Sequence, residues 1–520
     1  MPLGALYYFS FGYFKEMMKR GIKSTESLES ISETRAAQYF VLFGSLGDLS
    51  LRKIFPAWYQ LECAGLLGKS LKILGVARDE MSKDQFQQKI IDALKFRVPS
   101  EHFEEDVCKR LVGRIDYFQL DFQTATGYQQ LKHTIKDCGG QIVYYLATSP
   151  NISEAVCDNL YKTGAITNSS RIVVEKPIGH NLTSSKVIND KLASYFNEEQ
   201  IYRIDHYLGK ETVQNLIALR FGNSILSSQW NHNSIEYVEI TAAESVGIEG
   251  RWSYYDDVGQ MRDMIQSHLL QLLCLVAMEP PAKLNAQSIR NKKEQVLQAL
   301  VPISENNVST SLIRGQYCDG QSLEEVAPGY LNEIDAKSQS ETETFICIRA
   351  EIANWRWSGT PFYLRTGKRM PEKVTEIVIH FKADSHFIFD SDQKSMAGNS
   401  LIIRLQPTEG ISLQVLTKSQ GLEQGMRLRR DPLHLDFSES QKISRIPDAY
   451  ERLLLEVLKG DQSLFVSRNE VELAWTWCDQ AIDAWRQSSQ PLYPYSAGSY
   501  GPDVAKVFIQ KYGHEWHEDR

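Results

Sequence analysis

The sequence predicts two domains of different class: an α/β domain with a doubly wound parallel sheet, then an α+β domain with a large, mostly antiparallel sheet covered by helices. Up to residue 205, short apolar runs alternate with helix-like segments. Beyond about residue 222, successive segments alternate polar and apolar residues, and few helices separate the later ones. We therefore expect domains at residues 37–205 and 206–520, after an N-terminal extension, residues 1–36, that we expect to be disordered.

The composition is typical of a globular protein and argues against several other classes of protein. The chain has 520 residues, 42% hydrophobic and 23% charged, as is usual for globular proteins. Its formal net charge of −8 argues against nucleic-acid binding through a basic surface. The eight cysteines include no Cys-x-x-Cys pair, so we expect reduced thiols, no metal site and a cytoplasmic location. No apolar run reaches the roughly 18–20 residues of a membrane span, so we expect no membrane association.

In the N-terminal extension, aromatic residues come first and positive charges follow. This order is the reverse of the order in a secretory signal. The extension is therefore either the product of an upstream start codon or a functional segment.

A glycine turn links the first predicted strand, residues 39–43, to a helix that continues through Leu61. Gly44 and Gly47 let the backbone approach a phosphate, and a helix N-terminus offers free N–H groups. The spacing is Gly-x-x-Gly and not the full Gly-x-Gly-x-x-Gly. The turn by itself therefore leaves dinucleotide binding and an ordinary strand–helix connection equally open.

The end of the second predicted strand, residues 71–77, indicates which nucleotide is bound. An acidic residue there would bind a ribose 2′-hydroxyl, whereas an arginine would bind a 2′-phosphate. Arg78 occupies this position and Ser45 can add a donor, which favours NADP over NAD. Asp79 complicates this interpretation, and a surface arginine at a strand end is the alternative.

Further strands and helices complete the first domain. We predict helices at residues 84–95, 101–112, 126–137, 153–162 and 183–196, and strands at residues 115–119, 141–147, 171–175 and 200–204. Ligands in doubly wound sheets lie beyond the carboxyl ends of the strands. Lys176 follows such a buried strand, which is unusual for a solvated lysine, and Pro177 stiffens the turn that presents it.

The second domain is predicted to be rich in strands. We predict strands at residues 235–243, 344–352, 374–382, 400–406 and 411–418, helices at residues 261–278, 285–300, 447–459 and 468–487, and a long loop at residues 316–342.

Residues 203–211 (RIDHYLGKE) combine cations, an imidazole, a phenol and carboxylates. A small sugar phosphate needs this mixture, with charge for the phosphate, hydrogen-bonding groups for the hydroxyls and a titratable group for proton transfer. The alternative is a solvated loop before a helix, because local motifs give false positives.

His268 lies in a helix that is apolar on nearly all sides after this residue, so it should be buried and hydrogen-bonded. It is either a satisfied core histidine or a general base. Asp263 would lie about 140° away around an α-helix, so Asp205 is the expected carboxylate partner.

Several segments together resemble glucose-6-phosphate dehydrogenases, in the order of that family, from about residue 39 to the C-terminus. They are residues 44–49 (GSLGDL), 174–179 (VEKPIG), 203–214 (RIDHYLGKETVQ), 262–271 (RDMIQSHLLQ) and 448–453 (DAYERL). The resemblance implies a Rossmann-like NADP-binding domain and a substrate-binding and oligomerisation domain, assembled as a homodimer or homotetramer.

The implied reaction oxidises C1 of D-glucose 6-phosphate to 6-phospho-D-glucono-1,5-lactone and transfers a hydride to NADP+, which is the first step of the oxidative pentose phosphate pathway. A broader hexose-6-phosphate dehydrogenase and a non-catalytic protein that binds NADP or sugar phosphate are the alternatives.

The resemblance also implies roles for individual residues. It makes His268 the general base and Asp205 its orienting carboxylate. The implied substrate-binding residues are Lys176, His206, Tyr207, Lys210, Glu244, Asp263, Lys368, Lys373 and Gln406. The implied cofactor-binding residues are Gly44, Ser45, Gly47, Asp48, Leu49, Arg78, Tyr145 and Lys176.

Three positions depart from the family pattern. The stretch that usually has two prolines after Leu-Ala reads Leu146-Ala147-Thr148-Ser149-Pro150 here, so this wall of the nicotinamide pocket is expected to differ. Ser50 replaces an alanine, and Lys373 replaces an arginine. A lysine offers a point charge instead of a planar fork, so the fit of the sugar phosphate is expected to differ.

Overall fold

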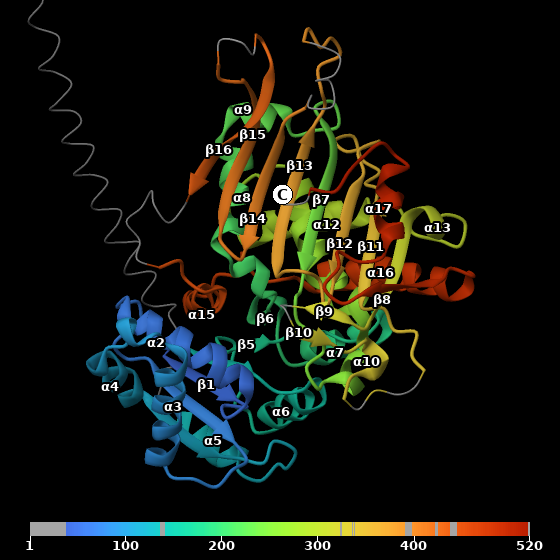
Figure 1. Cartoon of the computed structure of the whole chain (residues 1–520). Coiled ribbons are helices and arrows are strands. Elements are labelled where there is room, and N and C mark those ends of the chain that lie inside the picture. Colours follow the sequence, from blue (N-terminus) through green and yellow to red (C-terminus); the bar gives the residue numbers. More distant parts are fainter. Residues whose placement is uncertain are drawn as a thin grey trace, which may run out of the picture. The chain divides into compact units, whose positions relative to one another are not determined.

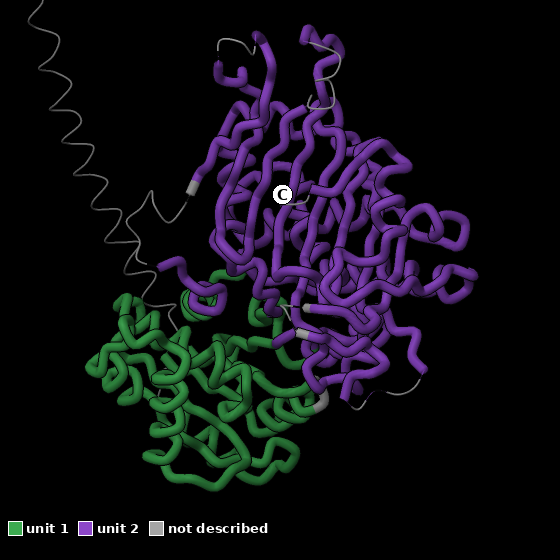
Figure 2. The backbone as a smooth tube through the Cα atoms, viewed as in Figure 1, with its two compact units in different colours: residues 1–174, 194–202, 453–462 green, residues 175–193, 203–452, 463–520 purple. Residues whose placement is uncertain are grey.

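The computed structural model describes residues 38–135, 141–322, 325–334, 336, 339–389, 398–421, 425–436 and 445–517. The predicted extension at residues 1–36 lies outside the described residues. The chain forms two compact units (Figure 2). Unit 1 comprises the chain up to Val174 with residues 194–202 and 453–462, and unit 2 comprises residues 175–193, 203–452 and 463–520.

A six-stranded sheet is the centre of unit 1 (Figure 1). Its strands are β1 (Tyr39–Phe43), β2 (Lys72–Ala77), β3 (Ile115–Gln119), β4 (Ile142–Leu146), β5 (Arg171–Val174) and β6 (Ile201–Arg203), in the order β3-β2-β1-β4-β5-β6. The pairs from β3 to β5 are parallel. The strand order changes direction between β1 and β4, where doubly wound sheets bind ligands. The predicted doubly wound parallel sheet is confirmed.

The central strands of unit 1 are buried on both faces, which explains their continuous apolar sequences. All five residues of β1 and of β4 are buried. The Phe40 and Trp58 rings pack edge to face with centroids 4.8 Å apart. The connecting helices of unit 1 are η1 (Ser50–Ile54), α2 (Phe55–Cys63), α3 (Lys83–Arg97), α4 (Glu105–Gly113), α5 (Tyr128–Ile135) and α6 (Pro150–Lys162).

Unit 1 also contains the C-terminal part of α15 (Ala449–Lys459), so the compact units differ from the predicted boundary at residue 205. The Arg171 guanidinium donates to the carbonyls of Val457 and Leu458 at 2.8 Å each. The Gln462 amide donates to the Ile201 carbonyl at 2.8 Å. A local sequence pattern cannot show such contacts, because the partners lie more than 250 residues apart.

Unit 2 contains a nine-stranded sheet in the order β16-β15-β14-β13-β7-β12-β11-β8-β17. The strands are β7 (Ile235–Ala243), β8 (Leu312–Cys318), β11 (Phe345–Ala350), β12 (Phe362–Gly367), β13 (Val374–Phe381), β14 (Ser400–Gln406), β15 (Gly410–Lys418), β16 (Leu428–Asp436) and β17 (Leu492–Ser496). Only the β7–β12 and β8–β17 pairs are parallel. The predicted mostly antiparallel sheet is confirmed.

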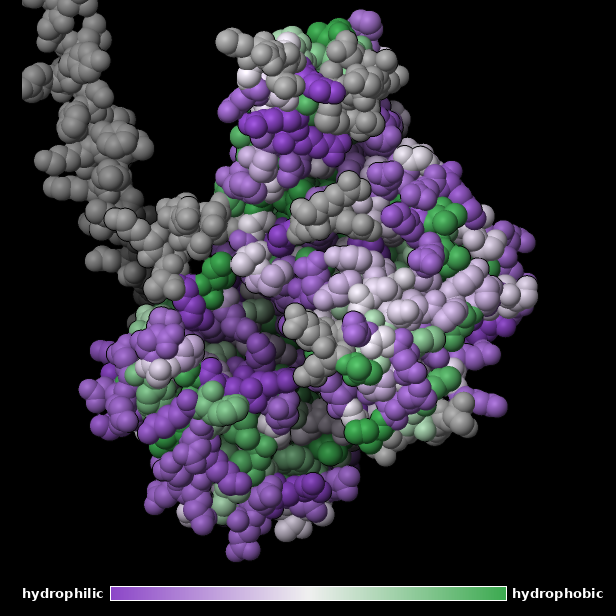
Figure 3. All heavy atoms as spheres, in the orientation of Figure 1, coloured by the Kyte–Doolittle hydropathy of each residue, from purple (hydrophilic) through white to green (hydrophobic). Residues whose placement is uncertain are grey.

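Helices of unit 2 pack behind this sheet (Figure 1). They are α8 (Glu211–Gly222), α9 (Ser224–Gln229), α11 (Leu270–Ala277), α12 (Ala286–Gln298) and α16 (Arg468–Gln487). Every residue of α11 is buried, as the apolar sequence after His268 predicted. Hydrophilic residues cover most of the face shown in Figure 3, with hydrophobic side chains scattered among them.

The prediction of a long loop at residues 316–342 was wrong in part. This segment contains the end of β8, then β9 (Gly320–Ser322), β10 (Glu325–Ala327) and a short helix η6 (Tyr330–Asn332). The short elements are held by long-range contacts, such as the bond from Trp252 Nε1 to the Tyr330 carbonyl at 3.0 Å. Local sequence does not encode such contacts.

Candidate active site

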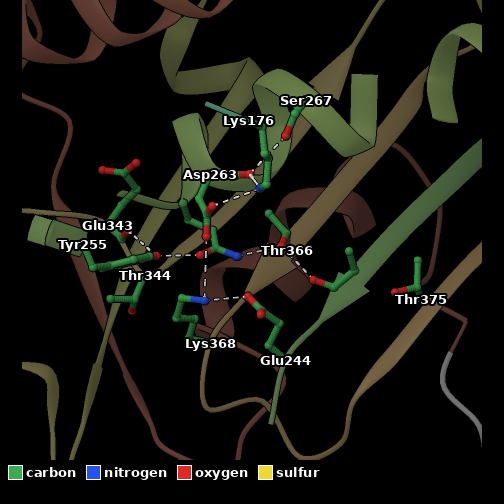
Figure 4. Close-up of polar contacts among 12 residues, drawn as sticks. Lys176, Glu244, Tyr255, Asp263, Ser267, Glu343, Thr344, Thr366, Lys368 and Thr375 are labelled. Atoms are coloured by element: carbon green, nitrogen blue, oxygen red, sulfur yellow. Dashed lines mark hydrogen bonds and ion pairs between the residues drawn. The ribbon is translucent and has the colours of Figure 1, made fainter. Parts of the chain in front are cut away.

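Four charged side chains of unit 2 form a chain of alternating sign (Figure 4). Lys176 Nζ donates to Asp263 Oδ1 at 3.1 Å and to the Asp263 carbonyl at 2.8 Å. Lys368 Nζ lies 3.9 Å from Asp263 Oδ2 and donates to Glu244 Oε2 at 2.7 Å. The cluster presents donors and acceptors in turn, as several sugar hydroxyls require.

The sheet places Glu244 and Lys368 together. β7 and β12 are parallel neighbours, and Ala243 pairs with Gly367 at their carboxyl ends. Glu244 therefore follows directly after β7, and Lys368 follows directly after β12. Their contact follows from the register of two parallel strands.

Opposite charges within the cluster stabilise the ionised forms of Asp263 and Lys176. Burial opposes the ionised form of Asp263, but Lys176 and Lys368 outweigh it and lower the Asp263 pKa. Burial likewise opposes the charged form of Lys176, but Asp263, Asp205 and Glu244 outweigh it and raise the Lys176 pKa. Both side chains are therefore charged at neutral pH.

Asp263 and His268 lie on a π-helix, η5 (Met261–Leu269), and not on the α-helix that the sequence predicted. A π-helix closes its hydrogen bonds between residues five apart, and such helices are frequent at functional sites. The angle between residues 263 and 268 around η5 is therefore smaller than it would be in an α-helix. The expectation that they diverge by about 140° was wrong.

His268 is paired with Asp205, as the sequence led us to expect. His268 Nδ1 lies 2.6 Å from Asp205 Oδ1, and both side chains are 2% exposed. Burial opposes ionisation of Asp205, but His268 and the Tyr207 N–H lower the Asp205 pKa to about 2. Because an ionised carboxylate only accepts, Nδ1 of His268 donates and Nε2 is left as an acceptor.

Aromatic rings surround His268. The Tyr207 ring stacks on it with centroids 4.2 Å apart, and the His206 ring lies 4.5 Å away. Burial lowers the His268 pKa, although Asp205 acts in the opposite direction. Burial, His268 and the nearby lysines hold the His206 pKa well below its usual range. Both imidazoles are therefore neutral at physiological pH.

Residues 205–210 are mostly buried, which contradicts the alternative of a solvated loop. They form the 3-10 helix η4 (His206–Gly209), which Asp205 caps by accepting from the Tyr207 N–H at 3.0 Å. Lys210 Nζ lies 5.2 Å from the Tyr207 ring centroid and 3.5 Å from the Leu405 carbonyl. Gln406 follows Leu405 at the end of β14, so it lies near Lys210. Lys373 is exposed, one residue before β13.

An open pocket of unit 2 lies beside this cluster. Its lining includes Lys176, Asp263 and Lys368. The remaining lining residues are Pro177, Gly179, His180, Ile248, Arg251, Tyr254, Tyr255, Val258, Arg262, Gln266, Ser267 and Trp475. His268 and Asp205 are buried next to this charged wall and are not among the lining residues.

Most of the candidate cofactor residues lie in unit 1, just after the carboxyl ends of β1 and β2, whereas Tyr145 lies within β4 and Lys176 belongs to unit 2. Gly44 has φ of +82°, and a Cβ there would lie 2.4 Å from the Ala147 carbonyl oxygen. The buried Ser45 hydroxyl has no hydrogen-bond partner among the described residues, so it can donate to a ligand. Arg78 is exposed directly after β2. These features fit a dinucleotide with a 2′-phosphate.

The remaining cofactor candidates of unit 1 are Gly47, Asp48, Leu49 and Tyr145. Gly47 N donates to the Gly44 carbonyl at 3.0 Å, which closes the turn. Asp48 is exposed and pairs with Arg52, and Leu49 is half-buried. The Tyr145 side chain is fully buried, with its ring centroid 5.6 Å from that of Phe40. Its side chain therefore faces the core, and contact with a cofactor would have to come from its main chain.

The structure adds site residues that the sequence did not indicate. Lys368 Nζ lies 5.1 Å from the centroid of the buried Tyr255 ring. The Tyr255 hydroxyl donates to Gln260 Oε1 at 2.5 Å, and Gln260 Nε2 donates to Thr366 Oγ1 at 2.8 Å. No local motif marks these polar residues, because only the packed fold brings them together.

The described residues contain neither a membrane-spanning helix nor a cluster of metal ligands. None of their helices is both long enough and apolar enough to cross a membrane. No group of three or more His, Cys, Asp or Glu in the described ranges could hold a metal ion.

Both halves of the chain match sequence models of one protein family. Residues 41–215 match the sequence model described as glucose-6-phosphate dehydrogenase, NAD binding domain, and residues 217–517 match the C-terminal domain of the same family. The chain belongs to the glucose-6-phosphate dehydrogenase family. The resemblance seen in the sequence is confirmed.

Relatives within the glucose-6-phosphate dehydrogenase family match nearly the whole chain. A glucose-6-phosphate 1-dehydrogenase of Dickeya dadantii is 45% identical over 489 residues, which cover 94% of this chain and 99% of the relative. That of Rhizobium meliloti is 44% identical over 480 residues, which cover 92% and 97%. The solved structure of a glucose-6-phosphate dehydrogenase in complex with its substrate glucose 6-phosphate matches with a TM-score of 0.84 and 34% identity, over 92% of this chain and 98% of that chain.

Two departures from the glucose-6-phosphate dehydrogenase pattern are accommodated locally. The buried Ser50 hydroxyl donates to the Gly44 carbonyl at 2.9 Å, so the glycine turn absorbs the added group. The Thr148 hydroxyl lies 2.9 Å from that of Ser153, within a helix-entry turn.

Proposed function

We propose that this protein is an NADP-dependent glucose-6-phosphate dehydrogenase, which oxidises C1 of D-glucose 6-phosphate to 6-phospho-D-glucono-1,5-lactone. Family membership over nearly the whole chain supports the reaction. The observation that carries the mechanism is the buried His268–Asp205 pair, with Nδ1 and Oδ1 2.6 Å apart. It leaves one neutral imidazole nitrogen free to accept a proton next to a cluster suited to sugar hydroxyls.

The oxidation removes one proton and one hydride from the substrate. His268 Nε2 takes the proton of the C1 hydroxyl as the C1–O bond becomes a carbonyl. Asp205 stabilises the imidazolium that forms, and its hydrogen bond keeps the imidazole in the correct tautomer. NADP+, when bound, supplies the acceptor for the hydride from C1.

Binding of the sugar phosphate is divided between two groups of residues. We assign the phosphate to His206, Tyr207 and Lys210, because these offer N–H and O–H donors and a positive charge. We assign the ring hydroxyls to Lys176, Glu244, Asp263, Lys368 and Gln406, with Lys373 at the exposed edge. Phosphate binding away from the reacting carbon supplies orientation to the chemical step.

The cofactor residues that we propose are Gly44, Ser45, Gly47, Asp48, Leu49 and Arg78, with Tyr145 acting through its main chain and Lys176 as a group shared with the substrate. The buried, unpartnered hydroxyl of Ser45 and the exposed Arg78 support this assignment. For the assembly we propose a homodimer or homotetramer, which a sizing measurement with and without NADP+ would test. For the compartment we propose the cytoplasm.

The reaction is tested by following absorbance at 340 nm after mixing the protein with NADP+ and glucose 6-phosphate across a pH series. We expect NADPH to form. Equal turnover of galactose 6-phosphate would favour a broader hexose-6-phosphate dehydrogenase. Binding of both ligands with no rise in absorbance at any pH would make the protein a non-catalytic binder.

Replacing Arg78 by alanine is expected to weaken NADP+ much more than NAD+. A charge-assisted hydrogen bond is worth roughly 1.5–3 kcal/mol, or about 10- to 150-fold in affinity. The Michaelis constants of both cofactors measure the effect, and Arg97→Ala, an exposed arginine of α3, is the control. If the affinities for NADP+ and NAD+ fall by the same factor, Arg78 does not bind the 2′-phosphate.

Replacing Lys210 by alanine is expected to raise the Michaelis constant for glucose 6-phosphate by about 10- to 150-fold, since only this substrate presents a phosphate dianion. Free glucose serves as the control substrate, and its low activity should change little. If activity towards both substrates falls by the same factor, Lys210 acts on the sugar ring or on the fold.

A further inference from the structure

We propose that Glu343 is a positioning residue of this reaction: it caps the π-helix that carries Asp263 and His268 and so fixes both side chains relative to Lys368. The inference rests on the proposed function. Glu343 lies two residues before β11 and outside every motif that the sequence analysis singled out.

Glu343 caps the start of η5. α10 (Trp252–Gln260) ends at a break, Gly259 with φ of 70° and ψ of 172°, and η5 begins two residues later. The first N–H groups of any helix lack partners within the helix. Here the Met261 N–H donates to Glu343 Oε1 at 3.0 Å, and the Gln260 N–H donates to the Glu343 carbonyl at 3.0 Å. One residue therefore satisfies two donors at the start of η5.

The break at Gly259 is shaped around the Glu343 carboxyl group. A Cβ on Gly259 would lie 2.5 Å from Glu343 Oε1 and 2.9 Å from its Cδ. Glycine therefore provides the space that the Glu343 side chain fills, and it also tolerates the positive φ. Glu343 itself is 4% exposed, so water cannot replace it as the partner of the Met261 N–H.

The chain segment that carries the cap also holds the Lys368 backbone, and Figure 4 shows Glu343, Thr344 and Lys368 in the same region. The Thr344 carbonyl, one residue after Glu343, accepts from the Lys368 N–H at 2.9 Å. The Tyr495 hydroxyl donates to the Lys368 carbonyl at 2.7 Å and lies 3.0 Å from Thr344 Oγ1. Residues 343 and 344 thus anchor η5 on one side and the Lys368 backbone on the other.

The hydrogen-bonding pattern of η5 sets the positions of Asp263 and His268. A π-helix is rarer than an α-helix, and its hydrogen bonds run between residues five apart. A return to α-helical bonding would rotate Asp263 until it and His268 were about 140° apart around the helix. That rotation would separate Asp263 from Lys176 and Lys368, so the cap at Met261 maintains the charged cluster. Burial disfavours the charged carboxylate of Glu343 and so raises its pKa. An uncharged acceptor in the same place would avoid this desolvation penalty.

The test compares Glu343→Ala, which removes the acceptor, with Glu343→Gln, which keeps an acceptor oxygen without the charge. We expect Glu343→Ala to lower kcat for glucose 6-phosphate by about 10- to 100-fold per folded enzyme, since misplacement by about 1 Å can cost this much. We also expect the acidic limb of its pH profile to shift, because Asp263 acts on the His268 pKa. Glu343→Gln should stay within about threefold of the unsubstituted enzyme.

NADP+ affinity and the melting temperature establish that each variant is folded, and Glu341→Ala, an exposed glutamate two residues away, is the matched control. If Glu343→Ala does not fold, Glu343→Asp, which shortens the reach by one methylene, takes its place with the same expected loss.

Unchanged kcat and pH profile per folded enzyme would reduce Glu343 to a structural residue and overturn the proposal. Failure of folded Glu343→Gln to restore activity would overturn the capping mechanism as well. A failure of the proposed function would appear in the unsubstituted enzyme, whereas a failure of this inference would appear only in the variants.

Discussion

Replacing His268 by asparagine lowers the turnover number by about 10²- to 10⁴-fold, the usual contribution of a general base. Asparagine is close in size and keeps a donor towards Asp205, so the core around η5 should persist. Glucose 6-phosphate binding, measured by calorimetry without cofactor, should stay near normal because the phosphate residues are untouched. Steady-state rates at saturating substrate then isolate the chemical step.

His206→Asn is the matched control, because the two imidazoles lie only 4.5 Å apart and both are neutral at physiological pH. His268 is hydrogen-bonded to the Asp205 carboxylate, which stabilises an imidazolium, whereas His206 has no contact of this kind among the described residues. His206→Asn should therefore chiefly raise the Michaelis constant. Loss of turnover with intact binding in His206→Asn, together with unfolding of His268→Asn, would reverse the two assignments.

Replacing Asp205 by asparagine is expected to lower the turnover number by a similar factor. The asparagine amide can donate to His268 Nδ1, which places the proton on Nε2, the nitrogen that must accept from the substrate. The imidazolium would also lose its negatively charged partner at 2.6 Å. The turnover number across a pH series measures the effect. If Asp205→Asn leaves turnover unchanged, Asp205 serves only as the cap of η4.

The same substitution has a predictable effect on acid stability. The Asp205 pKa of about 2 lies below its unfolded value of about 3.9, so the folded state favours the ionised form. This contribution to stability is present above about pH 4 and is lost as the pH falls towards 2. Thermal melts of Asp205→Asn should therefore depend less steeply on pH in this window than those of the unsubstituted protein.

Much of the fold could be predicted because local pattern and tertiary environment agree. The predicted ranges of β1, β7, β14 and α16 match the observed bounds. β12 was missed because all six of its residues are buried, so it shows no alternation of polar and apolar residues. β16 was missed because Pro432 and several charged residues interrupt its sequence. Neighbouring strands, and not propensity, hold these two segments in the sheet.

Part of the candidate site could likewise be predicted from the sequence, and part could not. The contact between His268 and Asp205 could be expected, since a buried histidine requires a partner and a carboxylate was available. The π-helical register of η5 could not be predicted from local sequence, and the acceptor at its start, Glu343, lies 82 residues from Met261. Arg203 and Glu211 are charged residues of the same motif, yet one is buried against Asn189 and the other pairs with Arg452. Residue type alone does not separate these roles from substrate contacts.

The passage of α15 into unit 1 has a consequence for synthesis on the ribosome. Domains generally fold as units, the N-terminal one first as the chain emerges. Here the Arg171 guanidinium and the Ile201 carbonyl find their partners only when residues 457–462 have been made. The nascent nucleotide-binding half must therefore remain incomplete until almost the whole polypeptide has left the exit tunnel. For the same reason, a gene fragment that stops at residue 202 would encode a nucleotide-binding half with an unfinished edge.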